Sequence, residues 1–337
     1  MKLAIHHRPS SFSDRWIAHC KRENILFKIV NCFDTDIIEQ LKDCDALMWH
    51  HHHGHFKDVL AAQKILYALE HAGIKVFPDF KTDWHFDDKV AQKYLLEAVD
   101  APLVPSYVFY DKQEAMQWVE KTTFPKVWKL RGGAGSANVK LVRTKSEAKH
   151  LIHKAFGKGF PAFDKWGYFM ERIQRVKQGK EGIKGIAKGI YRLFLTTEFG
   201  KLQPNEKGYA YFQEFIPNNN FDIRVIVIGN KAFALKRMTR ENDFRASGSG
   251  NIIYEKDVIP IECIKIAFEV NQKVQSQSIA YDFVFDENKN PLIVELSYGF
   301  AVEAYDACQG YWDLDLNWYE EKFNPQEWMV EEIVKSL

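Results

Sequence analysis

The sequence predicts an α/β protein in which a parallel sheet is followed by a part built from antiparallel strand pairs. Over the first 80 residues, short apolar runs alternate with amphipathic segments of about 10 to 17 residues, as they do in βαβ units. Further along, apolar strands come in pairs joined by turn-rich segments such as DENKNP at 286–291, which is typical of hairpins. The 337 residues are 46% hydrophobic and 27% charged, which is the composition of a globular protein with a sizeable core.

The first part is expected to hold four strands and three helices. We expect strands at 2–6, 26–31, 45–50 and 75–79, and helices at 11–22, 35–43 and 56–72. In a parallel sheet of this kind, ligands bind beyond the carboxyl ends of the strands. Polar clusters follow two of these ends, His6-His7-Arg8 after the first strand and His50–His53 with His55 after the third.

The histidine run has three interpretations: a metal site, a polar loop that faces a substrate, or a solvated turn. Successive side chains of an extended segment point to opposite sides, so four adjacent histidines cannot all converge on one ion. A substrate-facing loop is therefore favoured over a metal site, and a solvated turn without a role stays open.

The rest of the chain mixes helices with paired strands. A helix at 87–100 is ended by Pro102 and Pro105. We then expect strands at 106–110, within 125–143, at 209–216, at 222–238, at 279–285 and at 291–296, and helices at 111–122, 146–156, 260–276 and from about Pro325. The predicted domains are 1–86, 87–208 and 209–337.

Composition excludes several classes of protein. Lys and Arg total 46 against 45 for Asp and Glu, and this net charge of +1 argues against a surface built for nucleic acid. The five cysteines are scattered without a CxxC pair, which disfavours a disulfide framework or a zinc ribbon. The N-terminal apolar run covers only residues 3–5, and no run of about 18 apolar residues occurs. We therefore expect a cytoplasmic protein.

A glycine-rich loop follows a strand that ends in Lys129. The loop is RGGAGSAN at 131–138, and a second apolar strand follows it. Glycines let backbone N–H groups approach phosphate oxygens closely, and a lysine supplies the opposite charge. Taken alone, a hairpin with a glycine turn is nearly as well supported as a phosphate site.

Two carboxylates lie in the hairpin DFVFDENKNPLIVEL. If Asp286 lies opposite Pro291, then Asp282 faces Glu295 across the hairpin, on one face of apolar strands. An unpaired buried carboxylate is costly, so each needs a partner. The partner is either Mg²⁺, which prefers oxygen ligands, or a lysine or arginine.

A third group of charges lies in residues 211–251. Its apolar strands contain Asp222, Arg224, Lys236 and Arg237, and Arg245 lies in a Ser/Gly-rich loop. These charges either face a phosphate and a carboxylate or point outward from an antiparallel sheet.

In combination, these motifs resemble the ATP-grasp superfamily. The motifs, in order, are Lys89 in a DK-containing helix, Lys129 before the glycine-rich hairpin, QEFIP, DIRV, ALKR, Asp282 and Glu295. The glutathione-synthetase-like and ribosomal-protein-glutamate-ligase-like branch looks closest. The resemblance covers most of 75–300, and it implies an ATP-grasp fold preceded by a parallel βαβ domain, the pre-ATP-grasp domain.

The resemblance also implies a role for each matching residue. The residues implied to bind ATP are Lys89, Lys129, Gly132, Gly133, Gly135, Ser136 and Asp222, together with a hinge that reads adenine, formed by Gln213, Glu214, Phe215 and Ile216. For catalysis the resemblance implies Arg237, Lys129 and Arg245, and for Mg²⁺ it implies Asp282, Glu295 and Ser297. The family writes the last metal motif as Glu-x-Asn, whereas this chain has Glu295-Leu296-Ser297, and Ser247 stands where relatives carry asparagine. The shorter serine puts a second Mg²⁺ in doubt.

The implied activity is ATP-dependent ligation of a carboxylate to an amine through an acyl phosphate. The substrates would be small molecules such as an amino acid, a peptide or an acidic sugar, with one or two Mg²⁺ ions and a homodimeric enzyme. A non-catalytic ATP-binding regulatory module, in which Ser297 marks lost activity, is the alternative.

Two further features have no place in these motifs. Residues 171–192 form a basic amphipathic stretch, either a contact for a membrane surface or polyanionic acceptor, or a solvated helix face. The pocket for the acceptor substrate is expected between the first strand ends and the loop after Ser297. Candidates to line it are His6, Arg8, His52, Tyr298, Glu303 and Tyr305.

Overall fold

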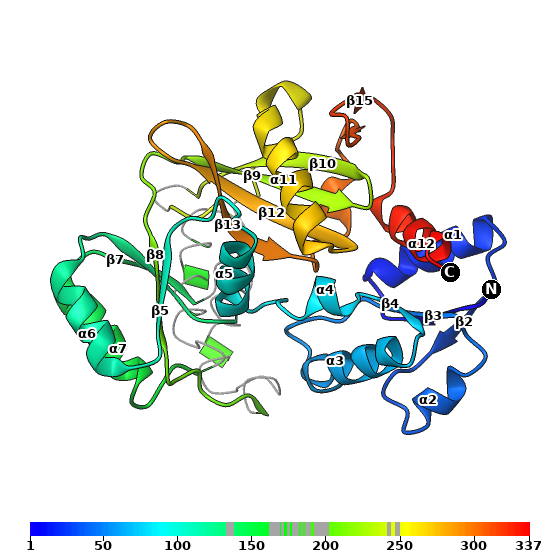
Figure 1. Cartoon of the computed structure of the whole chain (residues 1–337), viewed down its shortest axis with the longest axis horizontal. Coiled ribbons are helices and arrows are strands. Elements are labelled where there is room, and N and C mark those ends of the chain that lie inside the picture. Colours follow the sequence, from blue (N-terminus) through cyan, green and yellow to red (C-terminus); the bar gives the residue numbers. More distant parts are fainter. Residues whose placement is uncertain are drawn as a thin grey trace. The chain divides into compact units, whose positions relative to one another are not determined.

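The computed structural model describes residues 1–132, 138–161, 202–240, 244–246 and 250–337, with isolated residues between 162 and 201. By their contacts, the residues form two compact units (Figure 1). The larger unit contains Met1–His53, Lys57–Val104 and Ile216–Leu337, and the smaller unit contains Gly54–Phe56 and Pro105–Phe215.

The larger unit begins with a four-stranded parallel sheet in the order β2-β1-β3-β4. Its strands are β1 (Leu3–His6), β2 (Phe27–Val30), β3 (Ala46–Trp49) and β4 (Lys75–Phe77). They are connected by α1 (Phe12–Arg22), α2 (Ile37–Gln40) and α3 (Phe56–His71). The predicted parallel sheet is confirmed, and its central strands β1 and β3 are buried along their whole length.

Side-chain caps explain where several helices of this unit begin. The Ser11 hydroxyl accepts the backbone N–H of Ser13 and starts α1, while Asp79 starts the short helix α4 (Phe80–Asp83), which the sequence did not predict. Asp88 accepts the N–H groups of Val90 and Ala91, so that α5 (Lys89–Ala98) begins at Lys89. The cap therefore fixes the helical position of a residue expected to bind nucleotide.

The second sheet of the larger unit is antiparallel, in the order β13-β12-β9-β10-β14-β15, with β11 paired to β10. Its strands are β9 (Phe221–Ile228), β10 (Lys231–Met238), β11 (Ile252–Ile253), β12 (Ser278–Phe285), β13 (Pro291–Ser297), β14 (Tyr311–Trp312) and β15 (Trp318–Tyr319). Helix α11 (Ile261–Val274) packs on one face through apolar side chains. The short strands β14 and β15 were not predicted, because two-residue strands carry no periodic signal.

The hairpin of β12 and β13 corrects one step of the sequence argument. Asp286 forms a turn in which its Oδ1 accepts the N–H groups of Asn288 and Asn290, both at 2.8 Å. Phe285, and not Asp286, therefore lies opposite Pro291. A bulge after Asp282 restores the register, so the expected pairing of the two carboxylates across the hairpin is nevertheless correct.

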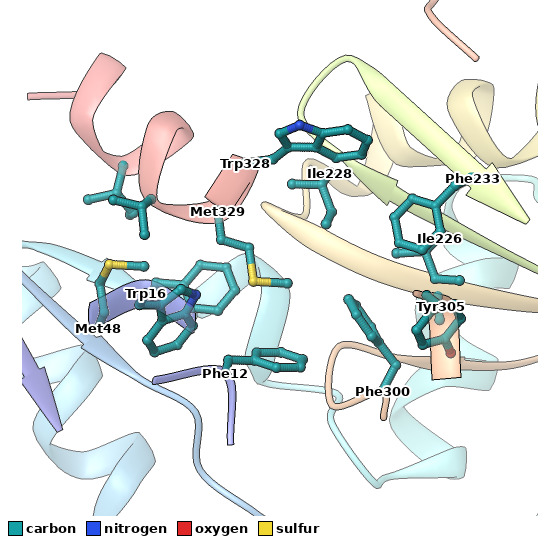
Figure 2. Close-up of a cluster of buried hydrophobic side chains, with 14 of the residues drawn as sticks. Phe12, Trp16, Met48, Ile226, Ile228, Phe233, Phe300, Tyr305, Trp328 and Met329 are labelled. Atoms are coloured by element: carbon teal, nitrogen blue, oxygen red, sulfur yellow. The ribbon is translucent and has the colours of Figure 1, made fainter. Parts of the chain in front are cut away.

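The other face of the antiparallel sheet joins the N-terminal sheet in one hydrophobic core. Figure 2 shows side chains from α1, β3, the antiparallel sheet and α12 (Pro325–Lys335) meeting in this cluster. The ring of Phe233 contacts those of Tyr305, Phe323 and Trp328, with centroids 5.0 to 6.0 Å apart. Because α1 and α12 also pack side by side (Figure 1), the first and last helices are parts of the same unit.

The smaller unit contains a four-stranded antiparallel sheet in the order β5-β8-β6-β7. Its elements are β5 (Ser106–Phe109), α6 (Lys112–Lys121), β6 (Lys126–Lys129), β7 (Val139–Val142), α7 (Lys145–Ala155) and β8 (Ala210–Glu214). Helices α6 and α7 lie side by side (Figure 1), and their apolar faces pack against Trp128 and Phe212. The predicted change from a parallel sheet to antiparallel strands is thus confirmed.

Three other expectations concern the whole chain. The contact units join residues 1–53 to 216–337, so the boundaries expected at 86 and 208 are not those of the units, and the three-domain division stays a prediction. All five cysteines are free and buried. In the part of the chain that the structure describes, no helix combines the length and the apolar character needed to cross a bilayer.

Replacing Phe233 with alanine is expected to destabilise the larger unit. Phe233 is fully buried and truncation leaves a cavity among aromatic rings, which costs about 3–5 kcal/mol of unfolding free energy. Chemical denaturation followed by circular dichroism measures the loss. Leu26→Ala, at a leucine that is 61% exposed, is the control, and equal stability of the two variants would contradict the prediction.

Candidate functional site

One face of the antiparallel sheet carries a row of charged side chains across four strands. Residues directly opposite each other in antiparallel strands share a face, as do residues two apart in one strand. Arg237 of β10 lies opposite Asp222 of β9. Two residues along β9, Arg224 lies opposite Asp282 of β12, which in turn lies opposite Glu295 of β13.

Four of these side chains form a joined network of ion pairs. Arg224 donates to both carboxylate oxygens of Asp282, each at 2.6 Å, and Arg237 holds Asp222 in the same way at 2.7 and 2.6 Å. Nη2 of Arg237 also lies 2.9 Å from Oδ2 of Asp282, which joins the pairs. Burial opposes ionisation of Asp282, but the two arginines hold its pKa well below the usual range. These four charges are therefore internal and not the outward-facing charges of a solvated sheet.

Helix α5 places Lys89 beside Glu295. β13 is an edge strand, and the Gln92 side chain bonds its backbone, with Nε2 donating to the Leu296 oxygen at 2.9 Å and Oε1 accepting the Leu296 N–H at 3.1 Å. One turn before Gln92, the Lys89 Nζ lies 3.1 Å from Oε1 of Glu295. Burial disfavours the ammonium, but Glu295 and Asp87 raise the pKa of Lys89 above its usual value.

Both predicted metal carboxylates thus have cationic partners, which was the alternative left open from the sequence. Among the residues that the structure describes, no group of three His, Cys, Asp or Glu side chains comes together as metal ligands. Mg²⁺ at phosphate-transfer sites nevertheless takes only one or two protein carboxylates, and phosphate oxygens and water supply the rest. Asp282 and Glu295 are ionisable oxygen ligands in register on one sheet face, and their chemistry fits such an ion.

In the smaller unit, Lys129 lies on a buried polar face of the sheet. It is 4% exposed and lies opposite Tyr211 in the register of β6 and β8. On the same face, the Ser106 hydroxyl accepts hydrogen bonds from the Tyr211 hydroxyl at 3.1 Å and from Gln213 Nε2 at 3.0 Å. The Gln213 side chain is therefore engaged in hydrogen bonding within the smaller unit.

The predicted hinge residues lie where the chain passes from one unit to the other. Phe215 is the last residue of the smaller unit and Ile216 is the first of the following segment of the larger one. The Glu214 carboxylate is held by Lys126 at 2.7 Å and by the Tyr107 hydroxyl at 3.2 Å. Lys126 is 3% exposed and points to the opposite face from Lys129, because the two lie three residues apart in a strand.

Other predicted residues are placed only in part. Gly133, Gly135, Ser136, Ser247 and most of 171–192 lie outside the described residues. The Gly132 oxygen accepts a hydrogen bond from Asn138 Nδ2 at 3.3 Å, and the Arg245 oxygen accepts the Arg240 N–H at 3.1 Å. Ser297 lies opposite Ala280, two residues beyond Glu295 on the same face of β13.

The histidine run divides into buried structural residues and more accessible ones. His50 Nδ1 accepts the Phe12 N–H at 3.1 Å, and His51 Nε2 lies 2.8 Å from the buried carboxylate of Asp83. His52 is exposed, and its ring stacks on that of His53 with centroids 4.2 Å apart. Burial and, to a smaller extent, the charge of Lys89 lower the pKa of His53 to about 4, while Glu295 opposes this shift. These separate surroundings agree with the argument that the run does not converge on one metal ion.

Sequence reasoning assigned no individual role to several residues that the structure places here. Arg224 was visible as a charge within an apolar strand, and Lys126 as a lysine in the buried strand sequence KVWK. Gln92 gave no comparable signal, because polar residues on amphipathic helices are common. Only its tertiary contacts with β13 distinguish it.

The pKa of His53 is expected to report the charges of Lys89 and Glu295. Lys89→Gln removes a positive charge, so the His53 pKa should rise from about 4. Glu295→Gln removes a negative charge, so the pKa of His53 should fall. Proton–nitrogen NMR of the imidazole measures both shifts, with Glu287→Gln on the exposed turn as the control. If the pKa of His53 stays the same in all three variants, the placement of His53 near Lys89 and Glu295 would be contradicted.

Two family models match the chain. Residues 88–181 match the carbamoyl-phosphate synthase L chain, ATP binding domain, and residues 201–311 match the RimK-like ATP-grasp domain. Together they span more than half of the chain. A comparison with curated protein sequences finds no match.

Solved structures share the fold at low sequence identity. The RimK domain protein ATP-grasp from Sphaerobacter thermophilus is 14% identical with a TM-score of 0.57, and the match covers 99% of this chain and 100% of that one. D-alanine–D-alanine ligase from Bacillus anthracis, complexed with ATP, is 12% identical with a TM-score of 0.59, covering 100% and 97%. The biotin carboxylase domain of Hydrogenobacter thermophilus 2-oxoglutarate carboxylase is 13% identical with a TM-score of 0.61, covering 99% and 69%.

At these identities the structural likeness shows the fold alone, and the family models add the sequence evidence. The order of the sequence motifs, the parallel sheet followed by antiparallel sheets and the two model matches agree. The chain belongs to the ATP-grasp superfamily, with a RimK-like C-terminal part.

Proposed function

We propose that the protein is an ATP-dependent ligase that joins a carboxylate to an amine through an acyl phosphate. The observation that carries the proposal is the row of charges on β9, β10, β12 and β13. It presents two carboxylates in register, Asp282 and Glu295, beside the cations Arg237 and Lys89. Phosphoryl transfer needs this combination, because it depends on positioning and charge neutralisation more than on covalent help from the protein.

Nucleotide binding is assigned to the residues that match the family's motifs. Lys89 and Lys129 are buried lysines that would neutralise phosphate oxygens, and Asp222 would contact the nucleotide. Gln213, Glu214, Phe215 and Ile216 would form the adenine-reading hinge. Mg²⁺, held by Asp282 and Glu295, would offset the charge of the phosphates. Ser297 would reach the ion less directly than the asparagine of relatives.

The remaining chemistry is assigned to Arg237 and the loop that contains Arg245. The substrate carboxylate attacks the terminal phosphorus of ATP and ADP leaves, and the amine then attacks the acyl phosphate and displaces phosphate. Arg237 is held in a fixed orientation by Asp222, so its guanidinium is preorganised to stabilise charge on the transferred phosphoryl group and on the tetrahedral oxyanion. Arg245 would contact the acceptor.

The substrates are proposed to be small molecules, an amino acid, a peptide or an acidic sugar, and the enzyme a cytoplasmic homodimer. Contact of 171–192 with a membrane or a polyanionic acceptor is part of the same proposal. ATP binding without turnover is the competing function, and the serine at position 297 is the observation that favours it.

Removing the charge of Lys129, proposed to bind phosphate, or of Glu295, proposed to bind Mg²⁺, is expected to abolish ligation. Lys129→Met and Glu295→Gln should each lower ADP release by about 100-fold or more in a screen of acids with amines, because each removes charge stabilisation in the transition state. A coupled assay for ADP measures the rate.

The matched controls are Lys140→Met on β7 and Glu287→Gln on the hairpin turn, both exposed. Full ADP release by the two site variants would overturn the ligase proposal. Nucleotide binding without ADP formation across the whole screen would favour the regulatory module.

Mg²⁺ and ATP are expected to bind with positive coupling that depends on Glu295. Lys89 and Glu295 neutralise each other, and phosphate with Mg²⁺ would supply each with a new partner. We expect Mg²⁺ to tighten ATP binding by about 10-fold in the wild type. Glu295→Gln should bind metal-free ATP more tightly than the wild type and lose the Mg²⁺ effect. Calorimetric titrations with ATP in the presence of Mg²⁺ or of EDTA measure the two affinities. The same coupling in Glu295→Gln as in the wild type would contradict the prediction.

A further inference from the structure

The strand order of the N-terminal sheet defines a place for ligand binding. From β1 the chain crosses to β2 on one side, and from β3 it crosses to β4 on the other, in a sheet ordered β2-β1-β3-β4. In parallel sheets such a reversal opens a crevice at the carboxyl ends of the two central strands. The segments after β1 and β3, which begin at His7 and His50, border this point.

Three residues from different segments meet there. Arg8 follows β1, and its Nη1 donates to Oδ2 of Asp58 on α3 at 3.0 Å. The same oxygen accepts the backbone N–H of His52, which follows β3, at 2.8 Å. Asp58 therefore draws the two strand ends together and orients both the guanidinium and the histidine backbone.

The Arg8 backbone is also held in place. The Ser13 hydroxyl donates to the Arg8 oxygen and accepts the Arg8 N–H, both at 3.1 Å. His7 Nδ1 lies 3.1 Å from the same hydroxyl. An arginine fixed at its backbone and at one edge of its guanidinium loses little freedom when it binds a ligand.

In the ion pair between Arg8 and Asp58, the arginine is the partner that reaches solvent. The Asp58 side chain is 2% exposed, whereas that of Arg8 is 31% exposed. A purely structural pair would need only to neutralise the buried carboxylate. Here the carboxylate lies within the fold, and a forked donor that matches carboxylate and phosphate oxygens reaches solvent.

A chain of contacts leads from this point to the proposed reaction centre. The exposed ring of His52 stacks on that of His53, the His53 ring contacts that of Phe86, and the Phe86 ring contacts that of Tyr298. Tyr298, just beyond β13, donates its hydroxyl proton to the His51 oxygen at 2.9 Å. The crevice at the strand ends and the charged end of β13 are therefore neighbouring parts of the larger unit.

We propose that Arg8, oriented by Asp58 and with His52 beside it, binds an anionic group of a substrate, a carboxylate or a phosphate distinct from the reacting carboxyl group. The inference rests on the proposed ligase function and narrows its substrates to molecules with such a second anionic group. Arg8 is the specificity-determining residue, and Asp58 is a positioning residue that acts through it.

The first test detects anion binding at Arg8 without nucleotide or turnover. Wild-type protein is treated with phenylglyoxal, which modifies accessible arginines, in the presence of malonate, of inorganic phosphate or of chloride. Mass spectrometry then gives the modification rate of each arginine. We expect malonate or phosphate to slow modification of Arg8 by about fivefold relative to chloride. Exposed Arg143 is the control and should not be protected.

The anion that protects Arg8 from modification identifies the chemistry of the substrate group that Arg8 binds. Protection by malonate alone indicates a carboxylate, and protection by phosphate alone indicates a phosphoryl group. Equal modification of Arg8 in all three solutions would overturn the inference. This result does not depend on whether the protein releases ADP.

The second test uses the substrates identified by ADP release. Arg8→Gln should raise the KM of the anionic substrate by about 10- to 100-fold and leave the KM of MgATP within about twofold. Arg8→Lys, which keeps the charge but not the fork, should recover part of the loss, and Asp58→Asn should raise the same KM less than Arg8→Gln. Arg143→Gln is the matched control.

The two proposals fail in different ways. Absence of ADP release from every substrate pair, with Arg8 still protected by an anion, would reject the ligase function but not the anion site. ADP release with an unchanged substrate KM in Arg8→Gln would reject the anion site and leave the ligase function standing.

Discussion

The candidate site depends on two aspartates and two arginines that neutralise one another on a buried sheet face. Asp222, Arg224, Arg237 and Asp282 come from three adjacent strands, and an isolated charge at any of these buried positions would be costly. Removing one member of such a network leaves an uncompensated buried charge, so each charge requires the others. The network therefore fixes where Arg237 points and keeps Asp282 ionised. The register of β9, β10 and β12 is what brings the four together.

A second polar region organises the strand ends of the N-terminal sheet. The buried carboxylate of Asp83 contacts His51 at 2.8 Å and accepts the Tyr67 hydroxyl at 3.0 Å. The backbone oxygen of His51 then accepts the Tyr298 hydroxyl. Buried histidines thus connect the N-terminal sheet to the loop after β13, while His52 remains exposed. One sequence run therefore serves both the structure and an accessible surface.

Much of the fold followed from local patterns. The parallel sheet, the hairpins and the helix at 261–274 were predictable because apolar periodicity and turn residues act over a few neighbours. The pairing of Asp282 with Glu295 was also predicted, although through a turn register that was one residue off and that a bulge corrected. The short elements α4, β14 and β15 were missed, and for β14 and β15 the reason is that two residues carry no periodic signal.

The sequence by itself determined the superfamily, the order of the motifs and the residue types available for phosphate and metal. Only the tertiary structure decided that Asp282 is held by Arg224 and Arg237, that Lys89 meets Glu295, and that Asp58 orients Arg8. Ion pairs between strands and helices far apart in the chain depend on register and packing. A sequence pattern records which charges exist, whereas the fold alone decides which of them share a low-dielectric environment.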